Sequence, residues 1–257
     1  MIECQDVSFS YPASTLPDSE RQAGGALKHI SCTIEEGSFV LLCGTSGCGK
    51  TTMTRLFNGL IPHYHEGTYT GSVYLDGKDT RDLSLFDISL KVGSVFQNPR
   101  SQFFNVDTTS ELAFGPENHG IEEDLVRDRV KRVAAQLKLE PLLDRSIFSL
   151  SGGQKQRVAV ASAIASERPL ILFDEPTSGL DLFHMRQVAN VVNQVANTGR
   201  TALVVTHDPE FILRCCNYVL HLENGQIQES YSIEDSDGRE RLLKFFLSDM
   251  KKEVSTE

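Results

Sequence analysis

The chain has 257 residues, of which 40% are hydrophobic and 23% are charged, a composition typical of a soluble globular protein with one large domain or slightly more. Its formal net charge of -10 argues against a general binder of nucleic-acid backbones. The first residues do not resemble a signal peptide and no run reaches about 18 apolar residues, so we expect no membrane span, and we expect the six cysteines to be reduced thiols of a cytosolic protein.

Two strands are predicted at the start of the chain, over residues 2–9 and 27–34, and the alternation in the second is typical of a half-exposed strand. Tyr11-Pro12 ends the first strand, and Phe9 alternates with Tyr11 in the way expected of a core residue. The residues from 12 to 26 are rich in Pro, Ser, Thr, Asp and Gly, which is typical of a surface loop. This part of the chain is therefore expected to be antiparallel.

A glycine-rich loop follows the apolar run FVLLC at 39–43, which is typical of a strand buried on both faces. The loop reads GTSGCGKT over 44–51, matches G-x-x-x-x-G-K-[ST] and leads into a predicted helix through Leu60. In this motif backbone N–H groups surround phosphates, Lys50 neutralises their oxygens, and the Thr51 hydroxyl holds Mg²⁺. The strand–loop–helix context favours nucleotide binding over a glycine-rich turn with a surface lysine.

Further strands are predicted over residues 71–75 and 92–96, with a turn signal at Asp76-Gly77. Gln97 stands at the carboxyl end of the second strand, where it is either a ligand of Mg²⁺ or water, or an ordinary loop residue. Residues 103–143 are rich in helix signals and look like an inserted helical subdomain. One apolar face of this segment is formed by Val126, Val130, Val133, Ala134 and Leu137.

The stretch from Leu150 to Asp181 combines a glycine pair at a helix start with an apolar strand that ends in two carboxylates. Gly152 and Gly153 are unfavourable helix residues, and they suggest an anion at the helix N-terminus; the alternative is a Ser151 N-cap followed by a flexible turn. Asp174 ends the strand and is expected to hold Mg²⁺, and Glu175 is expected to orient or deprotonate an attacking water.

The last third of the chain predicts an amphipathic helix from Met185 to Ala196 and a buried strand over 201–205, followed by His207. Asn224-Gly225 predicts a hairpin between 218–222 and 226–229, and a short helix is predicted over 242–250. Because buried strands at 39–43, 170–174 and 201–205 alternate with helices, we expect a parallel α/β sheet. Ligands of such sheets lie at the carboxyl ends of the strands, which brings Gly44, Asp174 and His207 to one site.

The order and spacing of these motifs resemble the ATP-binding-cassette (ABC) ATPase family over about residues 1–230. The resemblance rests on GTSGCGKT, VFQNP, LSGGQKQR, LILFDEP, SGLD and the histidine of VVTHD. It implies an α/β P-loop NTPase fold with a parallel core sheet, an N-terminal antiparallel β subdomain and a helical subdomain inserted at about 98–165. Residues 231–257 would then be a C-terminal extension.

The resemblance also implies roles for individual residues. Glu175, His207 and Gln97 would be catalytic, with His207 sensing the γ-phosphate, and Thr51, Gln97 and Asp174 would hold Mg²⁺. In the family the signature of one subunit caps ATP held by another, so Ser151, Gly152, Gly153 and Gln154 would act on a partner's ATP. The D-loop at that interface would be Ser178, Gly179, Leu180 and Asp181. ATP would be bound by Tyr11, which matches the family's adenine-stacking aromatic, and by Gly44, Thr45, Ser46, Gly47, Cys48, Gly49, Lys50, Thr51 and Thr52.

The function implied is an ATPase that drives a membrane transporter through a dimer with a second ABC subunit, either the same chain or a paralogue. The segments 95–120 and 58–79 further resemble the ATPases of energy-coupling factor (ECF) importers of vitamins or metal ions. Such a chain would lie at the cytoplasmic face of the membrane, held by an ECF T-component and S-component, without nucleic acid. The alternative is a soluble ABC ATPase, such as an iron–sulfur scaffold component.

Two further features of the sequence are an adjacent pair of aromatic residues and a departure from the family pattern. Phe103 and Phe104 are either core residues of the helical subdomain or part of a socket for a membrane partner's helix. Leu182 follows the D-loop aspartate, where many relatives carry proline, and this departure bears on how the next helix begins.

Overall fold

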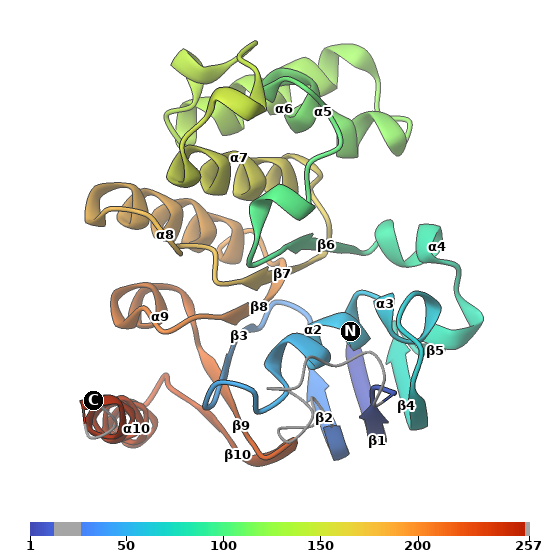
Figure 1. Ribbon diagram of the computed structural model, residues 1–257, viewed down its shortest axis with the longest axis vertical. Helices are drawn as coiled ribbons and strands as arrows, with labels where there is room; N and C mark the ends of the chain where they lie inside the picture. Colours follow the sequence, from blue (N-terminus) through green and yellow to red (C-terminus); the bar gives the residue numbers. More distant parts are fainter. Residues whose placement is uncertain (13–26, 255–257) are drawn as a thin grey trace.

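The computed structural model describes residues 1–12 and 27–254, and the side chains as far as residue 246. The loop expected at 12–26 therefore lies almost entirely outside the described residues. Two sheets organise the chain, one of four strands in the order β2-β1-β4-β5 and one of six in the order β10-β9-β3-β8-β7-β6. Figure 1 shows the first sheet beside α2 and a layer of helices beyond the β6 edge of the second.

The four-stranded sheet is antiparallel, as predicted. Its strands are β1 (Ile2–Ser10), β2 (Leu27–Ile34), β4 (Thr68–Leu75) and the short β5 (Lys78–Asp79). Asp76 and Gly77 both have positive φ, the geometry of a tight hairpin turn between β4 and β5. Apolar residues alternate inward along β1, where Phe9 is 2% exposed, which confirms its core position.

The six-stranded sheet is the core of the fold. Its parallel strands are β3 (Phe39–Cys43), β6 (Val92–Val95), β7 (Leu170–Asp174), β8 (Thr201–Val205) and β9 (Tyr218–Glu223), and the antiparallel β10 (Gln226–Ser232) closes one edge. Every residue of β3, β7 and β8 is buried. Phe39 and Leu41 contribute to one apolar cluster and Val40 and Leu42 to another, so this sheet is buried on both faces.

Helices cover the core sheet and carry its connections. They are α2 (Lys50–Phe57), α3 (Leu60–His63), α4 (Leu85–Ser89), α8 (Leu182–Ala196) and α9 (Pro209–Cys215). The helix predicted through Leu60 ends at Phe57, because Gly59 has a φ of 76° and packs where a Cβ would lie 2.4 Å from Ile88 Cδ1. The short α4 and α9 were not predicted, since they are too brief to show a periodic apolar pattern.

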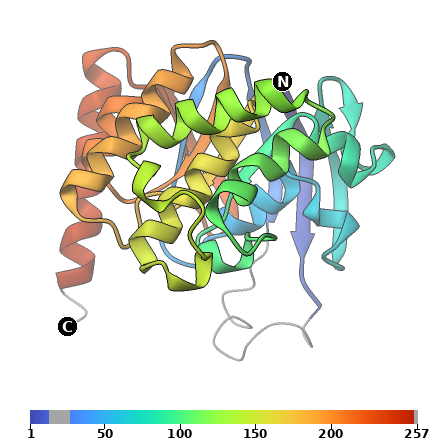
Figure 2. The ribbon, with the colours of Figure 1, turned by 90° about the horizontal axis from the view of Figure 1, so that it is seen from above.

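A layer of three longer helices lies beyond the β6 edge (Figure 1), and Figure 2 shows it from above. They are α5 (Thr108–Asn118), α6 (Glu123–Gln136) and α7 (Gly152–Ala165). The predicted apolar face of α6 is buried, with Val133, Ala134 and Leu137 at most 1% exposed. Single 3₁₀ turns occupy Thr80–Asp82, Pro99–Ser101, Glu140–Leu142 and Ile147–Ser149.

The last helix, α10 (Ser236–Val254), is longer than the one predicted over 242–250. Its first turns are polar and are joined by ion pairs between Asp237 and Arg241 and between Glu240 and Lys244, so apolar spacing begins only at Leu242. The Phe245 ring meets His221 of β9 at 4.7 Å between centroids. None of the helices in the described ranges is long and apolar enough to cross a membrane.

Candidate functional site

The loop between β3 and α2 is folded as a phosphate cradle. Gly44 has a φ of 149°, and a Cβ there would lie 2.0 Å from Leu222 O, so only glycine fits. The Lys50 ammonium donates to the Gly44 and Thr45 carbonyl oxygens at 2.7 and 2.9 Å. It is thereby held across the loop that runs through Ser46, Gly47, Cys48 and Gly49 into the N-terminus of α2. Backbone N–H groups and a lysine at a helix start are the donors that a polyphosphate requires.

Two oxygen donors of a kind that suits Mg²⁺ meet beside this loop. The Thr51 hydroxyl lies 3.4 Å from Asp174 Oδ2 at the carboxyl end of β7. Burial is the main reason that the pKa of Asp174 is raised, and its hydrogen bond to Thr51 and the charge of Lys50 oppose the rise. No group of three or more His, Cys, Asp or Glu suited to a metal occurs in the described ranges. A hydroxyl and one carboxylate still fit Mg²⁺, which takes few protein ligands and shares the phosphates of its nucleotide.

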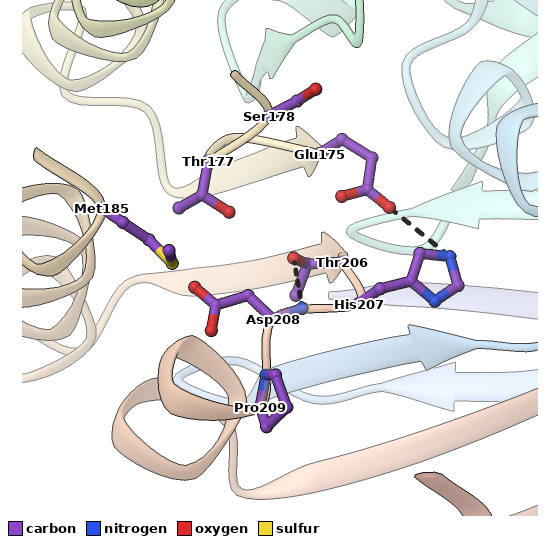
Figure 3. A pocket seen from close by; sticks show the side chains of 8 residues that line it. All are labelled: Glu175, Thr177, Ser178, Met185, Thr206, His207, Asp208 and Pro209. Carbon is purple, nitrogen blue, oxygen red and sulfur yellow. Dashed lines mark hydrogen bonds and ion pairs between the residues drawn. The ribbon is translucent and has the colours of Figure 1, made fainter. Parts of the chain in front are cut away.

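Glu175 is held by its backbone at the end of β7. Its N–H donates to Val205 O at 2.8 Å, and the Gln156 amide of α7 donates to its carbonyl at 3.2 Å. Its carboxylate lies 3.6 Å from His207 Nε2, and Figure 3 shows the two side chains turned toward each other. Burial, followed by the negative charge of Asp174, raises the pKa of Glu175 to about 7. A carboxylate with such a pKa is suited to accept a proton from water near neutral pH.

A cavity of about 330 Å³ opens beside Glu175 and His207. Its lining comes from the ends of β7 and β8 and from the starts of α8 and α9, as Figure 3 shows, and consists of Glu175, Thr177, Ser178, Met185, Thr206, His207, Asp208 and Pro209. The D-loop residue Ser178 is therefore part of the same hollow as the candidate base. The geometry brings Glu175, His207 and the D-loop together.

The raised pKa of Glu175 predicts that the carboxylate destabilises the free protein. The folded chain holds this proton up to about pH 7, whereas an exposed glutamate loses it near pH 4.3. The stability that the protonated form provides is therefore complete below about pH 4 and is lost as the pH rises to 7. We expect Glu175→Gln to raise the free energy of unfolding by up to about 3 kcal/mol at pH 8, and by almost nothing at pH 4.5. Denaturant titrations without nucleotide or Mg²⁺ at both pH values measure this difference, and equal gains at both would contradict it.

The start of α7 confirms the Ser151 N-cap, and the glycine pair that follows it is part of the helix. Ser151 is the N-cap, and its Oγ and N are hydrogen-bonded to the Gln154 N and Oε1 in a capping box. Gly152 has open space around the position of its missing Cβ. Gly153 packs against the D-loop, since a Cβ there would meet Leu180 Cδ2 at 3.2 Å and Gly179 O at 3.3 Å. The signature and the D-loop thus form one surface, with Ser151, Gly152, Ser178, Gly179 and Asp181 exposed.

Helix α8 begins normally despite Leu182. Asp181 caps the helix by accepting a hydrogen bond from His184 N at 2.9 Å, and Leu182 is its first residue. The absence of proline therefore leaves the helix start intact.

The remaining predicted site residues are Tyr11, Thr52 and Gln97. The Tyr11 hydroxyl accepts a hydrogen bond from Arg55 of α2 at 2.8 Å, which ties this aromatic to the helix after the phosphate loop. Thr52 is 4% exposed in the first turn of α2. Gln97 follows β6 and is exposed, and within the described part of the chain no hydrogen bond joins it to Thr51 or Asp174.

Two contacts of Glu175 escaped sequence analysis. Gln156 reaches its carbonyl from α7, and a hydrogen bond with the Thr206 side chain lowers its pKa. The available signal for Gln156 was its polar side chain in a helix that is buried nearly all round. Gln156 itself is 1% exposed. Buried polar side chains need a partner, and here that partner is the backbone of the candidate base.

Comparison with known proteins identifies the family that the sequence motifs resemble. The profile of the ABC transporter family matches residues 27–178. An ABC transporter ATP-binding protein of Treponema denticola is 38% identical over 234 residues, which cover 91% of this chain and 46% of that relative. The chain thus spans about half the length of that relative, whereas its match to the corresponding protein of Pyrococcus furiosus, at 37% identity, covers 89% of this chain and 82% of the relative.

Solved structures show the same fold. The ATP-binding cassette MJ0796, in a dimeric post-hydrolysis state with ADP and Pi, is 26% identical with a TM-score of 0.76, covering 91% of this chain and all of that one. CbiO1 of Clostridium perfringens, described as part of the ABC transporter complex cbiONQ, is 25% identical with a TM-score of 0.73. That match covers 99% of this chain and 98% of CbiO1.

Proposed function

The chain belongs to the ABC transporter family, and on this premise we propose that it binds Mg²⁺–ATP and hydrolyses it as the ATPase subunit of a membrane transporter. The observation that carries the ATPase function is the meeting of Lys50, the Thr51–Asp174 pair and the Glu175–His207 pair at one edge of the core sheet. In this proposal residues 1–230 are the nucleotide-binding domain, with a helical subdomain at about 98–165, and 231–257 are an extension.

The proposed reaction follows from these side chains. Lys50 and the loop N–H groups bind the β- and γ-phosphates, and Thr51 and Asp174, with Gln97, hold Mg²⁺. Glu175 takes a proton from water while His207 contacts the γ-phosphate. The stabilisation of developing charge on the phosphate is completed by Ser151–Gln154 of a second cassette. Tyr11 is proposed to stack on adenine, an interaction that is worth about 1–3 kcal/mol in nucleic-acid complexes.

An apolar surface supports attachment to a membrane protein. Phe104 is 75% exposed and stacks on Phe114 of α5, and Phe86 of α4 is 59% exposed and stacks on His119. His119 also contacts Ser89 of α4 at 3.3 Å. We name Phe86, Phe104, Phe114 and His119 the α4–α5 face and propose that a helix of the membrane partner packs on it. Phe103, by contrast, packs against the core of the helical layer.

The finer proposal is an ECF-type importer of vitamins or metal ions, with T- and S-components as partners and a second ABC subunit, located at the cytoplasmic face of the membrane. The resemblance of segments 95–120 and 58–79 supports it, as does the likeness to CbiO1, part of the complex cbiONQ.

Co-purification tests the transport function. We expect the tagged chain, isolated from detergent-solubilised membranes of its own host, to carry a polytopic membrane protein identified by mass spectrometry. Phe104→Ser should lower the recovery of that protein at least tenfold while ATP binding is unchanged, since an exposed apolar anchor is lost. Leu213→Ser, at a side chain of α9 that is 55% exposed, is the matched control. A soluble scaffold partner in place of a membrane protein would contradict transport.

A further inference from the structure

A group of arginines surrounds a single carboxylate where α6 and α7 meet the core sheet. Arg129 and Arg132, one turn apart on α6, lie 2.8 and 2.5 Å from the two Glu167 oxygens, and Arg200 lies 3.8 Å from the oxygen that Arg132 contacts. In the described ranges no second carboxylate forms an ion pair with these guanidinium groups. Three cations therefore share one anion in a chain whose overall charge is -10.

A fourth arginine increases this excess of positive charge. Arg168 is 9% exposed, and its guanidinium donates to a backbone oxygen, Leu90 O, at 3.3 Å. Burial and the charge of Arg129 lower the pKa of Arg168. The pKa of Arg200 is also lowered, by burial and by Arg132 and Arg129, although Glu167 opposes this. The guanidinium groups thus destabilise one another, and an added anion would relieve that repulsion.

Two of these arginines, Arg132 and Arg200, border a cavity of about 310 Å³ between α6, the end of α7 and α8. Arg132, Arg200 and Glu167 lie on its wall, and the amides of Gln136 and Gln194 are joined at 3.1 Å across it. Other parts of the lining are apolar and include Val133, Ile164, Val191 and Val195. The hollow therefore offers charged donors beside amide groups and an apolar wall, which is a common composition for a small-molecule site.

This cavity is separate from the candidate ATP site. Glu167 and Arg168 come just before β7, and Arg200 just before β8, whereas Asp174, Glu175 and His207 follow the other ends of these strands. Each strand has five residues, so the two sites are roughly 16 Å apart along the sheet. Figure 1 shows β7 and β8 side by side, and both strands lie between the two sites.

We propose that this arginine cavity binds a phosphate monoester, either a free phosphorylated metabolite or the headgroup of a monoester phospholipid. The group of Arg129, Arg132, Arg200 and Glu167 carries two net positive charges, and three of its members, Arg132, Arg200 and Glu167, line the cavity. A phosphate monoester carries about -1.5 to -2 charge at pH 7. Guanidinium pairs match phosphate oxygens in geometry, since their N–H groups form a planar fork. The apolar wall accommodates the carbon skeleton of the ester.

Calorimetry on the Glu175→Gln chain with saturating Mg²⁺–ATP tests the proposal, because the nucleotide site is then occupied. We expect glucose 6-phosphate to bind once per chain with a Kd below about 1 mM, and glucose not to bind. Arg132→Gln should weaken binding at least tenfold, and its side chain is 53% exposed, so the fold should tolerate the change. Arg127→Gln, on the same helix but paired with Glu123, is the charge-matched control.

A second arm distinguishes the sources of the phosphate. The same proteins are sedimented with phosphatidylcholine vesicles with and without phosphatidic acid. Binding to glucose 6-phosphate alone supports a free metabolite, and binding only to phosphatidic acid vesicles supports a lipid headgroup. No binding in either arm, or equal binding by Arg132→Gln and the control, would overturn the proposal. If Arg132→Gln unfolds in a thermal melt, Arg200→Gln replaces it under the same criteria.

Discussion

Glu175→Gln is expected to lower the rate of ATP hydrolysis by about 10²–10⁴-fold, the usual contribution of a general base, while the affinity for ATP stays within a few-fold of the native value. The glutamine amide fills nearly the same volume but cannot accept the proton of the attacking water. The groups that bind phosphate and metal, Lys50, Thr51 and Asp174, are untouched. Single-turnover phosphate release measures the first effect, and equilibrium binding of a fluorescent ATP analogue measures the second.

The same variant should accumulate an ATP-bound dimer, because closure requires ATP but opening requires its hydrolysis. Size-exclusion chromatography with light scattering, with and without Mg²⁺–ATP, measures this mass. Glu229→Gln, an exposed carboxylate of β10, is the control for loss of charge and should behave as the native chain. Hydrolysis by Glu175→Gln at a rate near the native one would remove Glu175 from the proposed role.

The core sheet was predictable from sequence, and so were the parts of the site that lie within single segments of the chain. FVLLC, LILF and TALVV are continuous apolar runs, and they form β3, β7 and β8 with every residue buried. Because parallel strands align their carboxyl ends, the phosphate loop, Asp174 and His207 had to meet at one edge. The hairpin at Asn224-Gly225 was predictable for a similarly local reason, since both residues adopt positive φ.

Contacts between segments distant in sequence were not predictable. The Gln156–Glu175 bond joins α7 to the end of β7, and the ion pairs around Glu167 gather Arg129 and Arg132 from α6 and Arg200 from the turn before β8. Each of these residues is an ordinary charged or polar position in its own segment. Only the packing of α6 against α7 and the core sheet turns them into a group, and no periodicity or motif reports that packing.

The signature and the catalytic carboxylates of one chain are proposed to serve two different ATP molecules. Ser151, Gly152 and three of the four D-loop residues are exposed, and the signature meets the D-loop where Gly153 packs against Leu180. Glu175 and Lys50, by contrast, serve the nucleotide of their own chain in the proposed reaction. If the signature completes a site in a second copy, a monomer should hydrolyse ATP poorly. Defects in Lys50 and in the signature should then complement each other between chains.

Mixing Lys50→Ala with Gly152→Asp is therefore expected to restore about one quarter of native ATPase activity from two inactive proteins, if copies of this chain pair at random. Lys50→Ala removes the phosphate ligand, and Gly152→Asp places a carboxylate on the open side of the signature, where a partner's γ-phosphate would approach. An acidic residue in the first turn favours the helix, so α7 should stay folded. In a mixed dimer the intact loop of one chain faces the intact signature of the other, which leaves one of two sites complete.

The crossed control carries both substitutions in one chain and mixes it equally with native protein. If the signature acts between chains, mixed dimers have no complete site, and about one quarter of the activity remains, from native dimers alone. If it acts within a chain, every native subunit stays active, so about one half remains, and the two single variants fail to complement. Steady-state phosphate release is measured from both mixtures after the subunits have equilibrated. Action between chains gives the higher activity in the first mixture and the lower activity in the crossed control, and action within a chain gives the reverse. A general loss of stability in either variant cannot produce these opposite changes.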